Sequence, residues 1–204
     1  MATVAGLRER KKQKTRVAIQ RAAMKLFMKQ GYEATTVEQI ADAAEISPST
    51  FFNYFPSKED VVFTDDYDQR FTSMFESRPA DEPLGVAIRE TMNLALGQSM
   101  ERDRDVLLAR AQLVLDVPAL RARLWGDLVQ AQEQFAELIA ARSGRPADDF
   151  EVRVTAMVIV SALTVASTEW VRSGGREDLM EMINRALEVV ETGAQVHLSP
   201  GRVG

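Results

Sequence analysis

The sequence predicts an all-α fold of about nine helices, and three observations on this 204-residue chain support that prediction. Apolar residues recur at spacings of three and four in almost every segment, which is the period of an amphipathic helix. The prolines fall between these segments, where they interrupt or begin helices. No segment shows the strict alternation of polar and apolar residues that is typical of a half-buried strand.

The first two helices have clear signals at their ends. After a loose basic leader, an apolar stripe ends at Gly31, the residue type that most often follows a helix. Thr36 and Gln39 fit a capping box, in which each side chain accepts a hydrogen bond from the other residue's backbone N–H, and this predicts a short second helix. The stripe consists of Ile19, Ala23, Leu26 and Phe27.

The third and fourth helices follow at once. Ser47 is a good N-cap and Pro48 occupies the first helical position, where its missing N–H costs nothing. Pro56 keeps this third helix short, and Ser57 caps a fourth helix with Asp60 at its third position.

Residues 78–83 contain two prolines and form a connector, beyond which five longer helices are expected. A tail from residue 194 has no helical pattern and is predicted to be flexible. The five expected helices span about 84–101, 103–116, 118–142, 148–172 and 176–192.

Charge is distributed unevenly along the chain. Residues 1–30 carry nine Lys or Arg and one acid, a net charge of +8, whereas the remainder carries 16 basic and 29 acidic residues, a net charge of −13. The overall charge of −5 therefore describes neither part, and the basic segment is a candidate for contact with a polyanion.

Several classes of function are excluded. The chain has no cysteine and a single histidine, His197, so Cys/His zinc sites and imidazole-dependent triads are ruled out. Acidic pairs such as Asp65-Asp66 are more simply surface charges, so we predict no enzyme activity, no cofactor and no metal. A signal peptide is absent, and the longest uncharged run, 154–168, is too short to span a membrane. We therefore expect a cytoplasmic protein without a membrane partner.

The second and third helices, joined by a three-residue turn, match a helix-turn-helix unit. Phe51 and Phe55 are spaced to face inward, so the remaining side chains of the third helix face outward and offer hydroxyls and an amide to phosphates and base edges. The basic run from Arg8 to Arg16 would add salt-dependent binding to phosphates. The outward residues are Ser49, Thr50, Phe52, Asn53 and Tyr54.

The segment from Thr35 to Val62, TTVEQIADAAEISPSTFFNYFPSKEDVV, resembles the DNA-binding signature of the TetR family of bacterial transcriptional regulators. The resemblance is continuous over residues 12–62. It implies phosphate contacts from Thr36, Thr50, Tyr54 and Lys58, and base contacts from Ser49, Phe52 and Asn53. With these we place Ser47, Lys11 and Lys12 in the predicted DNA-binding set.

Two residues depart from the family pattern. The family usually has glycine where this chain has Glu45, at a position following a helix that needs a positive φ, so some strain is expected there. Tyrosine is frequent where Phe52 stands, so a hydroxyl contact is missing and Phe52 is available to a thymine methyl group instead.

The resemblance also implies that the last two helices form a four-helix bundle with a second copy of the chain. The helix around 152–170 is apolar on all sides, which requires burial on two sides. A homodimer would provide this, although the central helix of a monomer would show the same pattern. The predicted interface consists of Val152, Ala156, Ile159, Leu163, Met182, Ile183 and Ala186.

The other helices would enclose a cavity for a small, lipophilic effector, although each candidate lining residue could equally serve ordinary packing. The effector would favour one orientation of the fourth helix and so separate the two DNA-binding units. The candidate pocket residues are Tyr67, Phe71, Met92, Leu96, Leu113, Trp125 and Thr168.

These observations predict three regions: a helix-turn-helix DNA-binding domain at 1–60, a helical effector-binding and dimerisation domain at 61–193, and the tail at 194–204. The expected function is that of a ligand-responsive transcriptional regulator, by family habit a repressor. It would bind a palindromic operator in double-stranded DNA as a homodimer and be released by its effector. The alternative is a helical protein-interaction adaptor that uses its basic arm on an acidic partner.

Overall fold

The computed structural model describes residues 4–63 and 67–193, and the side chains of these except 4–9, 67–69, 98, 99, 101 and 102. Within those ranges it contains nine helices and no strand, which confirms the predicted all-α fold. The predicted tail at 194–204 lies outside the described residues. The helices are α1 (Val4–Gln30), α2 (Val37–Ala43), α3 (Pro48–Phe52), α4 (Asp60–Phe63), α5 (Tyr67–Glu76), α6 (Leu84–Asp116), α7 (Pro118–Ser143), α8 (Phe150–Arg172) and α9 (Leu179–Glu191).

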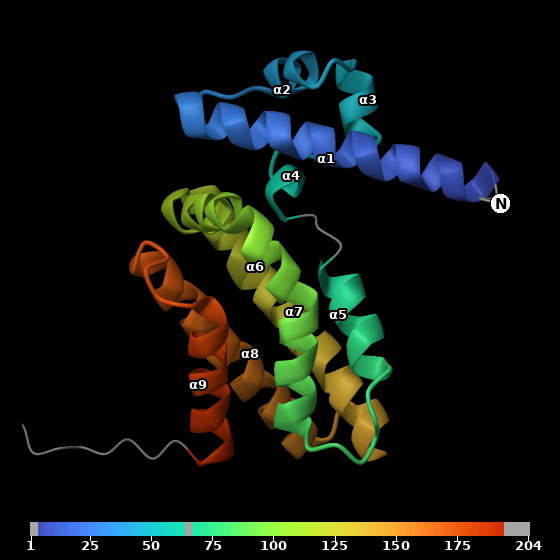
Figure 1. Ribbon diagram of the computed structural model, residues 1–204, viewed down its shortest axis with the longest axis vertical. Helices are drawn as coiled ribbons and strands as arrows, with labels where there is room; N and C mark the ends of the chain where they lie inside the picture. Colours follow the sequence, from blue (N-terminus) through green and yellow to red (C-terminus); the bar gives the residue numbers. More distant parts are fainter. Residues whose placement is uncertain (1–3, 64–66, 194–204) are drawn as a thin grey trace, which may run out of the picture. The chain divides into compact units, whose positions relative to one another are not determined.

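The chain divides into two compact units (Figure 1). Of the described residues, the first contains 4–63 and also 109–121, from the end of α6 and the start of α7. The second contains 67–108 and 122–193. We predicted a boundary near residue 60. The sequence did not indicate that a segment from the middle of the chain packs with the N-terminal helices.

In the first unit α2 packs against both α1 and α3, and α4 packs against α1 (Figure 1). The predicted loose basic leader is wrong from Val4 onward, because α1 is one continuous 27-residue helix. Lysine, arginine and glutamine are good helix formers, and no proline interrupts this stretch. The core of the unit includes Ile19, Ala23, Phe27, Tyr32, Ile40, Phe51, Phe55, Val61, Val62 and Leu120.

The predicted signals at the ends of α1, α2 and α3 are present. Gly31 has a φ of 88°, and Thr36 and Gln39 form the reciprocal capping box. Ser47 caps α3, with Pro48 at the first helical position. Ser57 accepts a hydrogen bond from the Asp60 backbone N–H at 3.2 Å, but α4 begins at Asp60, so Asp60 is its first residue and not its third as predicted.

The second unit is a bundle in which α8 and α9 pack along each other. The two helices predicted at 84–101 and 103–116 are joined as α6, with a kink at Asp103, whose φ of −127° and ψ of 22° are non-helical. Aromatic contacts link α5 to α7, with the ring centroids of Phe71 and Phe135 separated by 5.4 Å.

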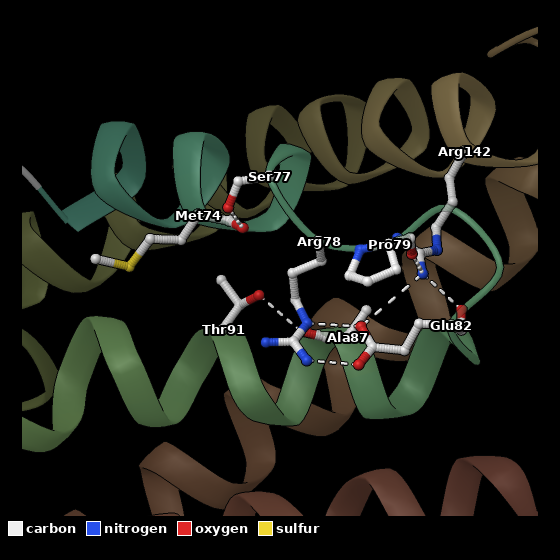
Figure 2. Close-up of polar contacts among 8 residues, drawn as sticks. All are labelled: Met74, Ser77, Arg78, Pro79, Glu82, Ala87, Thr91 and Arg142. Atoms are coloured by element: carbon white, nitrogen blue, oxygen red, sulfur yellow. Dashed lines mark hydrogen bonds and ion pairs between the residues drawn. The ribbon is translucent and has the colours of Figure 1, made fainter.

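The connector between α5 and α6 is held by side chains on both sides of it (Figure 2). Arg78 forms a bidentate ion pair with Glu82, four residues along, at 2.6 and 2.5 Å. Arg142, near the end of α7, donates hydrogen bonds to the backbone carbonyls of Pro79 and Glu82. The connector is therefore held by one arginine of its own and by another from α7.

Among the described helices, α8 alone is long and apolar enough to cross a membrane, by length and composition only. A third of its most apolar stretch is buried inside the protein. Its buried residues pack in the bundle.

Candidate nucleic-acid interface

The outer face of α3 is set by its two inward phenylalanines. Phe51 and Phe55 are fully buried, with ring centroids 5.8 Å apart. Their burial turns Ser49 and Asn53 to solvent, and leaves Phe52 53% exposed. Such a face suits the edges of bases in the major groove. The aromatic ring can contact a thymine methyl group, and the hydroxyl and the amide on either side of it can form hydrogen bonds with a base.

Three hydroxyl groups meet at the beginning of α3. Ser47 Oγ lies 2.8 Å from both Ser49 Oγ and Thr50 Oγ1, and it accepts a hydrogen bond from the Thr50 backbone N–H at 3.1 Å. Ser47 and Ser49 are exposed, and Thr50 is half-buried, as is Tyr54, two residues after the end of the helix. This cluster of donors and acceptors can rearrange to bind phosphate oxygens.

The turn between α2 and α3 carries the strain expected from the sequence. Glu45 has a φ of 56°, the only non-glycine residue with a positive φ in the described part of the chain. Its backbone N–H donates to the Asp42 carbonyl at 3.1 Å, and the next N–H, of Ile46, donates to the Ala41 carbonyl at 3.0 Å. The turn thus needs a left-handed residue, which an L side chain adopts at a cost of about 1–2 kcal/mol.

Lys58 lies in a different environment from the one that the family resemblance implies. Its ammonium donates hydrogen bonds to the backbone carbonyls of Tyr32 at 2.8 Å and Thr35 at 3.0 Å. The same nitrogen lies 4.0 Å from the centroid of the Tyr32 ring, close enough for a cation–π interaction. The charge of Lys58 is therefore directed into the turn between α1 and α2.

Glu59 makes a second contact to the same turn, because the Tyr32 hydroxyl donates to its carboxylate at 2.8 Å. Burial acts to raise the pKa of Glu59. Hydrogen bonds from its own backbone N–H, from Tyr32 and from Ser57, together with the charge of Lys58, outweigh that effect and lower the pKa below its ordinary value. Nothing in the sequence pattern indicated that this pair would hold the turn.

Most of the described basic side chains of α1 are exposed, whereas Arg16 is half-buried beside the Phe55 ring. Lys11 and Lys12 are exposed, as predicted for residues that meet a phosphate backbone. Further along, four basic residues surround small apolar ones at a surface groove of about 740 Å³. Those four are Arg10, Lys14, Arg21 and Lys25.

The faces of α8 differ from the prediction. Val152, Ala156 and Ile159 are buried within the chain's own core, as is Ile183 on α9, so these four are not accessible to a second chain. Leu163, Met182 and Ala186 are half-buried. An apolar row on another face of α8 is exposed instead, and it consists of Phe150, Val154, Met157, Val158 and Val165.

A groove of about 560 Å³ lies between α8 and α9. Its apolar lining comes from residues of both helices, among them Val165, Met182 and Ala186. Two acids, Glu169 and Glu177, and two bases, Arg172 and Arg185, also line it, so the charges of this face are balanced.

The predicted pocket residues differ in burial and in the unit to which they belong. Phe71 and Met92 are buried in the second unit, and Leu96 and Thr168 are half-buried. Trp125 is 64% exposed, and Leu113 packs against the core of the first unit. The side chain of Tyr67 is outside the described residues.

Sequence reasoning also missed a buried donor in the second unit. The side chain of Trp170 is 2% exposed, and its indole N–H has no hydrogen-bond partner in the described structure. A buried unpaired N–H is costly, so a water or a ligand acceptor is expected beside it.

A short capped helix that presents polar and aromatic side chains, next to a basic helix, defines a DNA-binding protein of the helix-turn-helix class. Comparison with known proteins is consistent with this. Residues 19–63 match the family model described as bacterial regulatory proteins, tetR family, and residues 82–195 match the model of the MftR C-terminal domain.

Two relatives have similar length. The HTH-type transcriptional regulator TcmR of Streptomyces glaucescens is 38% identical over 173 residues, which cover 81% of this chain and 76% of TcmR. MftR of Mycobacterium tuberculosis is 26% identical, with coverage of 84% and 86%.

Solved structures of similar fold are also known. FadR of Thermus thermophilus, a TetR-family repressor crystallised with lauroyl-CoA, is 26% identical, has a TM-score of 0.59, and covers 93% of this chain and all of its own. FadR of Bacillus halodurans, 22% identical with a TM-score of 0.61 and coverage of 88% and 95%, shows the same fold. The chain belongs to the TetR family of bacterial regulatory proteins: it is a transcriptional regulator and not an enzyme.

Proposed function

We propose that this protein represses transcription from the cytoplasm by binding a palindromic operator as a homodimer, and that a small lipophilic effector releases it. The observation that carries this proposal is the outer face of α3, where Ser49, Phe52 and Asn53 stand exposed above two buried phenylalanines. Asn53 would provide the hydrogen-bonded base contact, and Phe52 would contact a thymine methyl group.

Phosphate contacts would surround this base contact. Thr36, Ser47, Thr50 and Tyr54 lie on the same helix-turn-helix unit, and Lys11 and Lys12 extend the basic surface along α1. Each phosphate that a lysine neutralises releases counterions, so operator affinity should fall steeply with salt concentration.

The groove between α8 and α9 supports a homodimer. One short recognition helix reads too few base pairs for specificity, and two-fold related copies read a palindrome. The exposed apolar row of α8 continues into the groove through Val165, and the balanced charges at the groove suit a self-complementary surface.

Two observations support a lipophilic effector in the second unit. The relative from Thermus thermophilus was crystallised with lauroyl-CoA, which joins a long acyl chain to polar groups. In this chain Phe71 and Met92 supply buried apolar surface, and the unpaired Trp170 N–H could donate to a carbonyl of the effector.

The proposed response is a shift between two populations, of which the effector favours the one with low operator affinity. The link that could carry it is Arg110 of α6, which donates a hydrogen bond to the Val62 carbonyl in α4. A displacement of α6 would therefore pull on the Val62 carbonyl and shift α4.

Selection of genomic fragments by the purified full-length protein tests the proposal. We expect one enriched palindromic motif, affinity that falls with salt, and an altered base preference for Asn53→Ala at positions where the wild type is selective. Lauroyl-CoA serves as the first effector probe and should weaken operator binding. A protein that enriches no sequence at physiological salt, but captures an acidic protein, would instead be an adaptor.

A further inference from the structure

Hydrogen bonds of three side chains, those of Lys58, Glu59 and Thr35, hold the turn between α1 and α2. Lys58 donates to the carbonyls of Tyr32 and Thr35, and Glu59 accepts from the Tyr32 hydroxyl. The Thr35 hydroxyl in turn donates to the Gly31 carbonyl at 2.7 Å, and Thr35 itself is 1% exposed. The residue that follows this fixed turn is Thr36, whose side chain is exposed.

We propose that Lys58 is a positioning residue for operator binding: its ammonium fixes the turn that presents Thr36 to a phosphate, and it is not itself a phosphate ligand. This inference rests on the proposed function for the role of Thr36. Two of the three ammonium hydrogens are used by carbonyls of the turn, and the Tyr32 ring lies on the nitrogen at 4.0 Å. The carbonyls of Tyr32 and Thr35 would otherwise repel each other across the turn.

Lys58 and Thr36 lie far apart along the chain, so Lys58 fixes a turn that belongs to a distant segment. Lys58 precedes α4, whereas Thr36 begins α2, so the contact ties two segments that are far apart in sequence. The Tyr32 carbonyl also accepts the Thr35 backbone N–H at 3.2 Å. Loss of the ammonium would remove a charged donor from this carbonyl and from that of Thr35, and so loosen the residue next to Thr36.

The salt dependence of operator binding separates a positioning residue from a phosphate ligand. A lost phosphate contact flattens the slope of log affinity against log salt concentration by about 0.9. We expect Lys58→Met to weaken binding about tenfold at every salt concentration, with the slope unchanged. Lys12→Met, which removes a proposed phosphate contact, is the matched comparison and should flatten the slope.

A conservative variant gives a second criterion. Lys58→Arg keeps the positive charge, and arginine binds phosphate at least as well as lysine does. The longer planar guanidinium cannot reproduce one nitrogen between two carbonyls and a ring, so affinity should still fall. Full affinity of Lys58→Arg, or a flattened slope for Lys58→Met, would overturn the inference.

A double-mutant cycle tests whether Lys58 acts through Thr36. Once the hydroxyl is removed by Thr36→Val, a further Lys58→Met should weaken operator binding less than threefold, since both changes disturb one contact. Independent, multiplying losses would contradict the proposal. Circular dichroism must show each variant folded at the temperature of the binding assay.

Hydrogen exchange provides a measurement that needs no DNA. In Lys58→Met the Thr35 amide should exchange about tenfold faster, while the Phe51 and Tyr54 amides, which donate within α3, keep their rates. If the Thr35 amide keeps its rate, the positioning role is wrong. If no palindrome is enriched but the Thr35 amide responds, it is the operator function that fails.

Discussion

The Arg110 guanidinium donates a hydrogen bond to the backbone carbonyl of Val62, so that α6 caps the C-terminal end of α4. Val62 is buried, and α4 is a single turn whose last carbonyls have no partner within the helix. Arginine is well suited to this contact because its donors are fixed in a plane and always charged.

We therefore expect Arg110→Met to lower the free energy of unfolding by about 1–3 kcal/mol, the cost of leaving a buried carbonyl unpaired. Urea unfolding followed by circular dichroism measures this. Arg121→Met is the matched control, because Arg121 also donates to a carbonyl, that of Leu115 at 3.1 Å, but at an exposed site. Equal losses for the two variants would show that the capping of α4 contributes nothing particular.

Glu45→Gly should stabilise the protein by about 0.5–1 kcal/mol. Removing the Cβ relieves about 1–2 kcal/mol of left-handed strain, from which the greater chain entropy of glycine subtracts part. The φ of 56° at Glu45 is the reason for this expectation. Glu45→Gln keeps the strain but removes the charge. If the glutamine variant melts as high as the glycine variant, charge rather than backbone strain explains the effect.

Arg142→Met should release the connector between α5 and α6. The Arg142 side chain is 11% exposed, and it donates to two carbonyls of the connector while its guanidinium lies 5.6 Å from the Phe75 ring centroid. We expect a loss of about 1–3 kcal/mol in the free energy of unfolding and faster proteolysis within 78–83. Arg145→Met, which breaks only exposed ion pairs, should leave the connector resistant.

Local features of the fold were predictable because their causes lie within a few residues. The capping box at Thr36 and the N-cap at Ser47 follow from short-range geometry, the positive φ at Glu45 was implied by the family resemblance, and all three are present. The inward placement of Phe51 and Phe55 follows from their spacing of four.

Contacts between distant segments were not predictable in the same way. On α8 both Val152 and Val154 belong to apolar rows, and only packing decides which row is interior. Lys58 looks like a surface lysine in the sequence, and its partners are carbonyls of a turn more than 20 residues earlier. Carbonyls carry no sequence signal, so such a partner is visible only in the structure.

The effect of Gly85→Ala on the stability of the protein should depend on whether Glu191 is present. A Cβ at Gly85 would lie 1.7 Å from Glu191 Oε1, whose carboxylate is paired with Arg89 at 3.0 Å. Gly85→Ala gains up to about 1 kcal/mol of helix propensity but displaces the pair, so we expect a change within about 0.5 kcal/mol. In a Glu191→Ala background the same change should stabilise by about 0.5–1 kcal/mol. Thermal melts of the four proteins measure the coupling, and simple additivity would refute it.

The exposed row of α8 leads to a prediction about assembly. If this row and the adjacent groove bind a second copy, a charge placed there must be buried without a partner, which is strongly unfavourable. Val165 lines the groove and is 60% exposed in the single chain. Val165→Glu should therefore convert a dimer into a folded monomer, as measured by sedimentation velocity.

Val106→Glu is the matched control, because Val106 is 52% exposed on α6 and does not line the groove. It adds the same charge at a similar exposure and should leave the dimer intact. A dimer that survives Val165→Glu and dissociates with Val106→Glu would place the interface elsewhere. A monomeric Val165→Glu protein should also bind an isolated half-site as the wild type does but lose the preference for the full palindrome, since each α3 still reads its own bases.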